Sequence, residues 1–227
     1  MPVGVLTNVL AGAAGIGAGC LLTKKMPQSL RERFPTMFGF CAMGIGVNSI
    51  VKTPSLTVAI LATLIGYLIG HLLELENRTQ RMLEGVLRKL RFGGSDMNMY
   101  ITVVALFCFS GFGWYGTLSE SIGGNPDILF SKSVLDFFTA MLFAAMLGRS
   151  LFVVPVMQAA VLLAVFCAGK LAGGVFTPQM FTDLSACGGI LTLATGFRVA
   201  KIKNVDVINV MPALILVIPI SALMTMF

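Results

Sequence analysis

Long apolar runs dominate this sequence and place the strongest limit on what it can fold into. Eight runs separated by short polar stretches cover most of the 227 residues. A helix needs about 20 residues to cross the bilayer core, and helices satisfy their own backbone there. The predicted spans are 4–22, 36–51, 54–73, 99–118, 126–148, 151–169, 182–198 and 207–225. Several are short, so seven spans remain an alternative to eight.

Composition supports an all-α, polytopic transmembrane helix bundle. Charged residues make up 11% of the chain, against about 25% in soluble domains. The mean hydropathy is +0.90. The positive charges fall in alternate loops: Lys24, Lys25, Arg31 and Arg33, then Arg78, Arg81, Arg88, Lys89 and Arg91, then Arg149, then Arg198, Lys201 and Lys203. The positive-inside rule makes these loops cytoplasmic and puts both termini outside. The loops account for the net charge of +6, so we expect no nucleic-acid partner.

The third loop carries an amphipathic pattern. In residues 78–92, Leu83, Val86, Leu87 and Leu90 recur at helical spacing, with Arg and Lys opposite them. This pattern is typical of a helix lying on the cytoplasmic leaflet with its apolar face in lipid.

Internal similarity indicates repeats. "FPTMFGFCAMGIG" (34–46) is similar to "FFTAMLFAAMLG" (137–148), and the two lie on spans of opposite direction. We therefore expect an inverted 3+3 repeat followed by a C-terminal helical hairpin, a construction common in secondary transporters. The corresponding regions are 1–76 for the first repeat, 77–97 for the amphipathic linker, 98–177 for the second repeat and 178–227 for the hairpin.

A charged pair stands inside one apolar run. "SKSVLDFFTAM" (131–141) puts Lys132 and Asp136 four residues apart, on one helical face. Counting from the helix start at about residue 126, Asp136 lies roughly 15 Å in, near the bilayer centre. A charge there costs at least about 2.5–3.5 kcal/mol, so the pair must face protein or a water-filled cavity. It then either locks two helices together or serves a permeation or coupling path.

Other polar groups are candidates for the same site. They are Asn8 in the first span, Ser133 and Thr139 beside the pair, Gln158 in the sixth span, Asn209 in the eighth, and Glu120 just past the fourth. For Asn8 and Asn209, interhelical hydrogen bonding is the structural alternative. The glycine-rich "FSGFGWYGTLSES" (109–121) favours a broken helix whose ends can bind ions. The stretch from Asp183 to Ser185 is typical of a helix start.

Catalytic and metal chemistry lack their signatures. The sequence contains no HExxH, GxSxG or P-loop motif, so we expect no enzyme and no cofactor. Its five cysteines stand singly, and His71 is its one histidine, so no metal site is predicted.

Three segments identify a family. "ILFSKSVLDFFTAMLFAAMLG", "LSACGGILTLATG" and "NVMPALIL" resemble the YqgA-like bacterial inner-membrane proteins (domain of unknown function 554). The resemblance covers essentially the whole chain and implies a multi-pass protein of the bacterial inner membrane, described as a transporter without an established substrate. The residues that match its motifs are Lys132, Ser133, Asp136, Gly148, Ser185, Gly188, Gly189, Gly196, Asn209 and Pro212.

The sequence therefore predicts a secondary transporter or permease for a small solute or ion. Two alternatives stay open: a non-transporting scaffold or assembly protein in which Lys132 and Asp136 form a structural ion pair, and an ion channel. The expected partners are membrane lipid and a small solute or ion, and a homodimer remains open. A polar cavity that reaches Asp136 from one side would favour transport, and a sealed pair would favour the scaffold.

Overall fold

The computed structural model describes residues 1–22, 27–89 and 97–224, and these residues form helices without any strand. The helices are α1 (Val3–Leu22), α2 (Gln28–Ile50), α3 (Thr57–Leu72), α4 (Leu75–Lys89), α5 (Met97–Cys108), α6 (Gly111–Gly123), α7 (Asp127–Leu147), α8 (Val153–Ala172), α9 (Pro178–Val199), α10 (Val207–Val210) and α11 (Ala213–Met224). Short 3-10 turns cover Gly148–Phe152 and Gly173–Val175. The all-α prediction is confirmed.

Several helical segments have the length and composition to cross a bilayer. Five qualify within the described residues: Val3–Leu22, Met99–Gly123, Asp127–Ala172, Pro178–Val199 and Val207–Met224. A sixth is obtained if α3 and α4, which meet at a 55° bend, count as one segment. The chain is therefore helical with membrane-protein character.

Two of these segments contain interruptions with local causes. The first separates α5 from α6, where Ser110 is the N-cap and its Oγ accepts a hydrogen bond from the Gly113 N–H at 3.0 Å. This confirms the predicted helix break and places it at the start of the glycine-rich stretch. The second lies between α7 and α8, where Gly148 has φ +74°. Glycine reaches that backbone conformation without a steric penalty.

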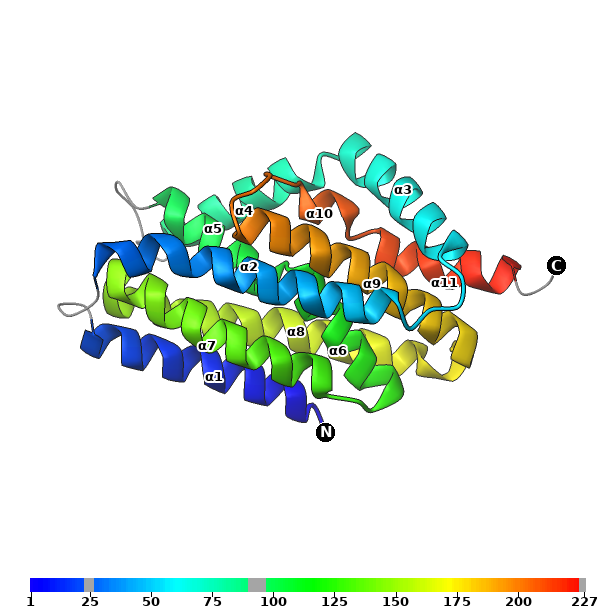
Figure 1. Cartoon of the computed structure of the whole chain (residues 1–227), viewed down its shortest axis with the longest axis horizontal. Helices are drawn as coiled ribbons and strands as arrows, with labels where there is room; N and C mark the ends of the chain where they lie inside the picture. Colours follow the sequence, from blue (N-terminus) through cyan, green and yellow to red (C-terminus); the bar gives the residue numbers. More distant parts are fainter. Residues whose placement is uncertain (23–26, 90–96, 225–227) are drawn as a thin grey trace.

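The helices pack as two groups with separate apolar cores. The first group, built from α1, α5, α7 and α8, surrounds a core that includes Ile16, Phe107 and Ala140. The second group, built from α2, α3, α9, α10 and α11, surrounds a core that includes Leu191 and Leu214. The short helix α6 contacts α8 of the first group and α9 of the second, so it joins them (Figure 1).

Glycines set the closest helix contacts. In α1, a β-carbon at Gly15 or Gly19 would collide with the backbone carbonyl of Phe137 or Met141 in α7. Between α2 and α9 the contact is reciprocal, because β-carbons at Gly46 and Gly189 would lie 2.7 and 2.8 Å from each other's carbonyl oxygens. Small residues at these positions let the backbones touch.

Two local expectations need correction. Asp183 does not start a helix: α9 begins five residues earlier at Pro178, where Thr177 Oγ1 accepts from Met180 N at 3.2 Å, and Asp183 is buried inside it. The amphipathic helix exists as α4, but Leu83 and Leu87 are buried in the first apolar core. Its apolar face therefore serves protein packing as well as any lipid contact.

Some predictions fall on residues that the structure leaves undescribed. Lys24 and Lys25 of the first basic loop, and Leu90 at the end of the amphipathic pattern, lie outside the described ranges.

Candidate functional site

Helix α7 carries the charged pair into the interior. Lys132 and Asp136 lie one turn apart on its buried face, and both side chains are almost fully shielded, at 2% and 10% exposure. The helix begins one residue later than predicted, at Asp127, whose N–H is bound by Asn125 Oδ1 at 2.9 Å. The pair therefore faces protein rather than lipid, as its energetic cost requires.

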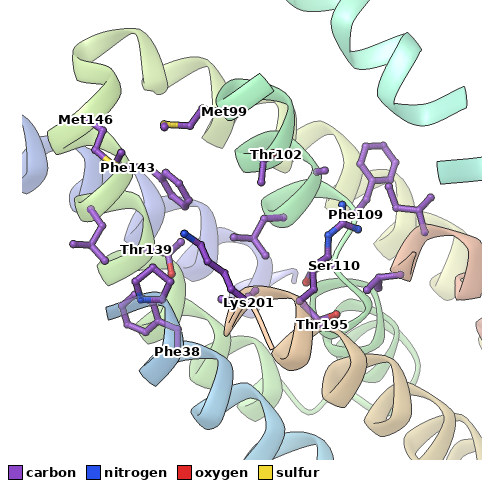
Figure 2. Close-up of a pocket in the computed structure, with 18 residues that line it drawn as sticks. Phe38, Met99, Thr102, Phe109, Ser110, Thr139, Phe143, Met146, Thr195 and Lys201 are labelled. Carbon is purple, nitrogen blue, oxygen red and sulfur yellow. The ribbon is translucent and has the colours of Figure 1, made fainter. Parts of the chain in front are cut away.

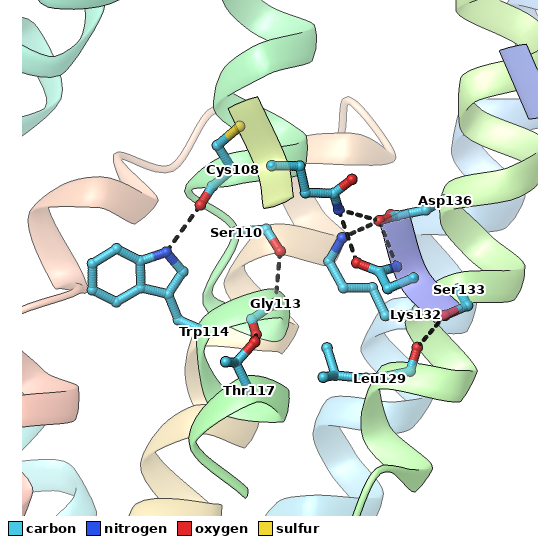
Figure 3. A network of polar contacts seen from close by, with 11 residues as sticks. Cys108, Ser110, Gly113, Trp114, Thr117, Leu129, Lys132, Ser133 and Asp136 are labelled. Atoms are coloured by element: carbon cyan, nitrogen blue, oxygen red, sulfur yellow. Dashed lines mark hydrogen bonds and ion pairs between the residues drawn. The ribbon is translucent and has the colours of Figure 1, made fainter. Parts of the chain in front are cut away.

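Four of the predicted site residues meet in one network, which we call the polar cluster: Asn8 of α1, Lys132 and Asp136 of α7, and Gln158 of α8. Asp136 Oδ2 accepts hydrogen bonds from Asn8 Nδ2 and Gln158 Nε2, each at 2.9 Å, and forms an ion pair with Lys132 Nζ (Figure 3). Gln158 Nε2 also donates to Asn8 Oδ1 at 2.8 Å. The predicted interhelical hydrogen bonding of Asn8 is confirmed.

Lys132 reaches from the polar cluster toward the break between α5 and α6. Its ammonium lies 5.6 Å from the centre of the Phe107 ring in α5, within cation–π range. A β-carbon at Gly113 of α6 would lie 3.0 Å from Lys132 Cε. The absence of a side chain at Gly113 is thus what lets the lysine pass beside the first turn of α6.

One atom of the polar cluster has unused bonding capacity. Gln158 Oε1 is buried and has no hydrogen-bond partner within the described part of the chain. It faces Gly12 of α1, where a β-carbon would lie 3.7 Å away. A buried unpaired carbonyl oxygen costs about 1–3 kcal/mol, so this acceptor is a place where a proton donor would bind favourably.

Two predicted site residues on α7 stand beside the polar cluster rather than in it. Ser133 Oγ donates to the Leu129 carbonyl at 2.7 Å, which is a bond within the helix. Thr139 lies one turn beyond Asp136 and lines the cavity described below.

Glu120 and Asn209 have other partners. Glu120 of α6 accepts from the backbone N–H groups of Gly4 and Val5, at 2.7 and 3.2 Å, and so caps α1. A carboxylate at this position is also stabilised by the positive, N-terminal end of the α1 dipole. Asn209 of α10 accepts from Glu76 N at 2.9 Å, which confirms its predicted interhelical bonding. The recorded contacts of both residues are structural and lie outside the polar cluster.

Glu76 organises a second polar site at the start of α10. Its Oε2 accepts from Ile208 N at 3.1 Å, and its Oε1 forms an ion pair with Arg198 Nη1 at 2.8 Å. Glu76 thereby ties α4 to both α9 and α10. Arg198 also bounds the cavity, so its guanidinium is shared between this ion pair and the cavity wall.

A cavity of about 740 Å³ lies between the two helix groups. Its walls come from α2, α5, α7, α9 and α10, and its polar lining residues are Thr102, Ser110, Thr139, Thr195, Arg198 and Lys201. Figure 2 shows Lys201 extending into the cavity toward Thr139. The remaining lining is apolar and includes Phe38, Phe109 and Phe143. Its volume is in the range of small-molecule sites, about 300–1,000 Å³.

The cavity lining combines residues near helix ends with residues deeper in the bundle. The lining residues Met99, Met146 and Lys201 lie at or beside helix ends, whereas Ser110, at the break between α5 and α6, lies deeper in the bundle. The C-terminal ends of α4 and α7 lie toward the same end of the bundle, and α9 also runs toward it (Figure 1). The lining therefore includes residues beside the basic end of α9 and residues at the N-terminus of α6.

The polar cluster is separate from the cavity lining. Among the described residues that line the cavity, none belongs to the polar cluster. Asp136 does not line this cavity, because its side chain is held by Asn8, Lys132 and Gln158. A role of the pair in a permeation or coupling path stays a prediction. Thr139, a predicted site residue, lines the cavity, and so does Ser110 at the break between α5 and α6.

Sequence reasoning missed the cationic residues of the cavity. Arg198 and Lys201 were counted only as loop charges, because they follow an apolar run and fit the positive-inside pattern. Their position at the end of α9, three residues apart, was the available signal. Glu76 was missed because its partners are 122 and 132 residues away, and no local pattern links them.

The chain is similar to two curated proteins. The chain is 38% identical over 231 residues to the "Uncharacterized protein YqgA" of Escherichia coli (strain K12), covering 99% of this chain and 98% of that protein. It is 23% identical over 220 residues to the "Uncharacterized membrane protein YdfK" of Bacillus subtilis (strain 168), covering 94% and 93%. No solved structure matches it.

The family model described as "Protein of unknown function (DUF554)" matches residues 3–222, which is nearly the whole chain. Together with the identity to YqgA, this match confirms the family that the sequence motifs indicated. The chain belongs to the DUF554 family and is a YqgA-like member of it.

Proposed function

We propose that this protein is a permease or secondary transporter that moves a small solute or ion across the bacterial inner membrane. The observation that carries the proposal is the cavity of about 740 Å³ between two helix groups with separate cores. A binding site at the interface of two helix groups, open toward one side, is the arrangement on which alternating access depends.

Helix α6 supplies the closure on the far side. It is tied to the first group through Glu120, which caps α1, and it meets the second group along α9. On the α9 side, the Tyr115 hydroxyl is 2.5 Å from Ser185 Oγ, and Gly188 lies against the Tyr115 ring. Solute release to the other side would require this α6–α9 contact to separate while the basic end closes.

The polar cluster would couple an ion or a proton to that movement. Lys132 contacts the first turn of α6 at Gly113, and Ser110 of the same turn lines the cavity. A change in the charge of Asp136 or Lys132 would alter the forces on this turn, because a buried pair is stable only while both partners are present. Gln158 Oε1 provides an acceptor for an incoming donor.

The proposal includes a multi-pass topology of seven or eight spans with both termini outside and the basic loops in the cytoplasm. It also includes the inverted 3+3 repeat with a C-terminal hairpin. An inverted repeat requires α2 and α7 to run in opposite directions, as they do in Figure 1.

A structural scaffold is the second candidate. The polar cluster is enclosed, and none of its members is among the described residues that line the cavity, as expected of a pair that only fastens α1, α7 and α8 together. A channel is less well supported, because the described cavity lining ends at the α6 N-terminus.

Paired cysteine labelling distinguishes a moving permease from a static scaffold. In a cysteine-free background, Thr139→Cys should react with an impermeant maleimide from the basic side, and Ser185→Cys from the other side. Filling the cavity with a bulky adduct at Thr139→Cys should slow the labelling of Ser185→Cys, because both ends cannot be open together. The control adduct goes on Gly85→Cys of α4, which has open space around it and should have no effect. Independent labelling rates at the two positions would refute the permease.

A further inference from the structure

The cavity has charge of one sign. Of the described residues that line it, the charged ones are Arg198 and Lys201, and no acidic side chain joins them. Arg198 is partly neutralised by Glu76 at 2.8 Å. Lys201 forms no ion pair with any residue in the described ranges, and its side chain points into the cavity (Figure 2). An anion would therefore be attracted and a cation repelled.

The body of the cavity is apolar and partly aromatic. Phe38 of α2 and Phe143 of α7 face it from the two helix groups, and Met99 and Met146 flank the region near the basic end (Figure 2). Methionine side chains adapt their shape to different ligands, and aromatic rings offer large contact areas. The four hydroxyl-bearing residues (Thr102, Ser110, Thr139 and Thr195) supply dispersed polar groups.

We propose that the cavity binds a small amphipathic organic anion. Its negative group, of the carboxylate class, lies with Lys201 and Arg198, and its apolar or aromatic body lies between Phe38 and Phe143. This inference rests on the proposed function in that it names the class of solute that a permease with this cavity would carry. Charge-assisted hydrogen bonds to Lys and Arg are about twice as strong as neutral ones, so the cavity should bind the anion more tightly than an uncharged analogue.

The same chemistry can come from two sources. A dissolved organic acid could enter from the aqueous side, or an anionic lipid could place its headgroup near Lys201 and an acyl chain along the apolar wall. Both present one anionic group joined to an apolar body. The experiment separates them through the composition of the surrounding bilayer.

The test uses the full chain in nanodiscs of zwitterionic lipid and three probes of similar shape: 4-phenylbutyrate, 4-phenylbutanamide and 4-phenylbutylamine. Isothermal titration should show 4-phenylbutyrate binding at least about tenfold more tightly than the amide, with the amine weaker still. Lys201→Gln should weaken 4-phenylbutyrate by about tenfold and leave the amide unchanged. Lys201 is exposed, so this variant should fold.

Lys203→Gln is the matched control, because Lys203 is an exposed cation two residues away that is not among the lining residues. It removes the same net charge and should leave all three affinities unchanged. Equal binding of the butyrate and the amine, or an equal effect of the two glutamine variants, would overturn the inference.

Adding phosphatidylglycerol to the nanodiscs identifies the source of the anion. If it competes with 4-phenylbutyrate, the natural ligand is an anionic lipid; if it does not, the ligand is a dissolved acid, and either result supports an anion site. Failure of the anion site can be distinguished from failure of the permease. Anion binding without linked labelling rates would keep the anion site and remove the transport proposal. Linked labelling rates without anion selectivity would support the transport proposal and remove the anion site.

Discussion

Replacing Lys132 with methionine should destabilise the protein more than replacing Lys132 and Asp136 together. Methionine keeps most of the volume of the lysine stem but removes the ammonium group that pairs with Asp136 Oδ2. The carboxylate, 10% exposed, then keeps only the neutral donors Asn8 and Gln158, at 2.9 Å each. Removing one partner of a buried ion pair costs about 3–5 kcal/mol.

That free energy corresponds to a measurable loss of thermal stability. For a chain of this size, 1 kcal/mol shifts the midpoint by about 2–4 °C, so Lys132→Met should lower Tm by roughly 6–20 °C. In Lys132→Met/Asp136→Asn the uncompensated charge is gone, while the amide still accepts from Asn8 or Gln158. The double variant should recover at least about 2 kcal/mol relative to Lys132→Met.

The assay is thermal unfolding of the purified variants in one detergent, followed by fluorescence of Trp114, with Asp136→Asn completing the cycle. If Lys132→Met unfolds within 2 °C of wild type (roughly 1 kcal/mol or less), or if the double variant loses the sum of the two single effects, the pair does not stabilise the fold as described. Asp136→Asn also strands a buried charge, that of Lys132, so it should be destabilised as well. The coupling role further predicts that, in the folded fraction of this variant, the labelling of Thr139→Cys and Ser185→Cys becomes unlinked.

Three further changes test the packing, the cap and the topology. Gly15→Ala should lower the free energy of unfolding by about 3 kcal/mol or more, because its β-carbon meets the α7 backbone. The control Gly17→Ala, with no described atom within 4 Å, should be neutral or stabilising by about 0.5–1 kcal/mol. Equal thermal midpoints of the two variants would contradict the α1–α7 contact. Glu120→Gln should lower Tm by roughly 2–4 °C, because α1 loses its charged cap. An unchanged midpoint in the same unfolding assay would show that the charge of this cap does not stabilise the fold. Gly85→Cys should resist an impermeant maleimide in intact cells while Lys52→Cys reacts, and the opposite pattern would reverse the proposed orientation.

Much of the fold could be predicted from the sequence because lipid imposes a simple rule. A buried charge must find a partner, so the pairing of Asp136 with Lys132 followed from their spacing and depth. Asn8 and Gln158 could be predicted only as candidates for the same site, because no local pattern determines which helices meet. In the first span, Ala11, Gly15 and Gly19 recur at intervals of four, a spacing that favours close helix approach. The partner of Gly15, the carbonyl of Phe137, appears only in three dimensions.

The cavity could not be predicted because it is a property of two helix groups together. Its lining comes from helices far apart in sequence, and its cations also satisfy the ordinary charge pattern of loops. Glu120 was expected at the site because of its charge, yet it stabilises the start of α1. An acid near the membrane interface can serve a helix dipole as readily as a solute, and sequence alone does not separate these uses.

The pairing of early helices with late ones has a consequence for how the protein is made. α1 packs on α7, α2 on α9, and α3 on α11, so each of the first three helices leaves the ribosome long before its partner exists. Asn8 and Asp136 are 128 residues apart, a delay on the order of ten seconds at about 5–20 residues per second. During that interval the glycine faces of α1 and α2, and the amide of Asn8, have no partner helix. We therefore expect these faces to be covered by other molecules, such as lipid, until the second half of the chain arrives.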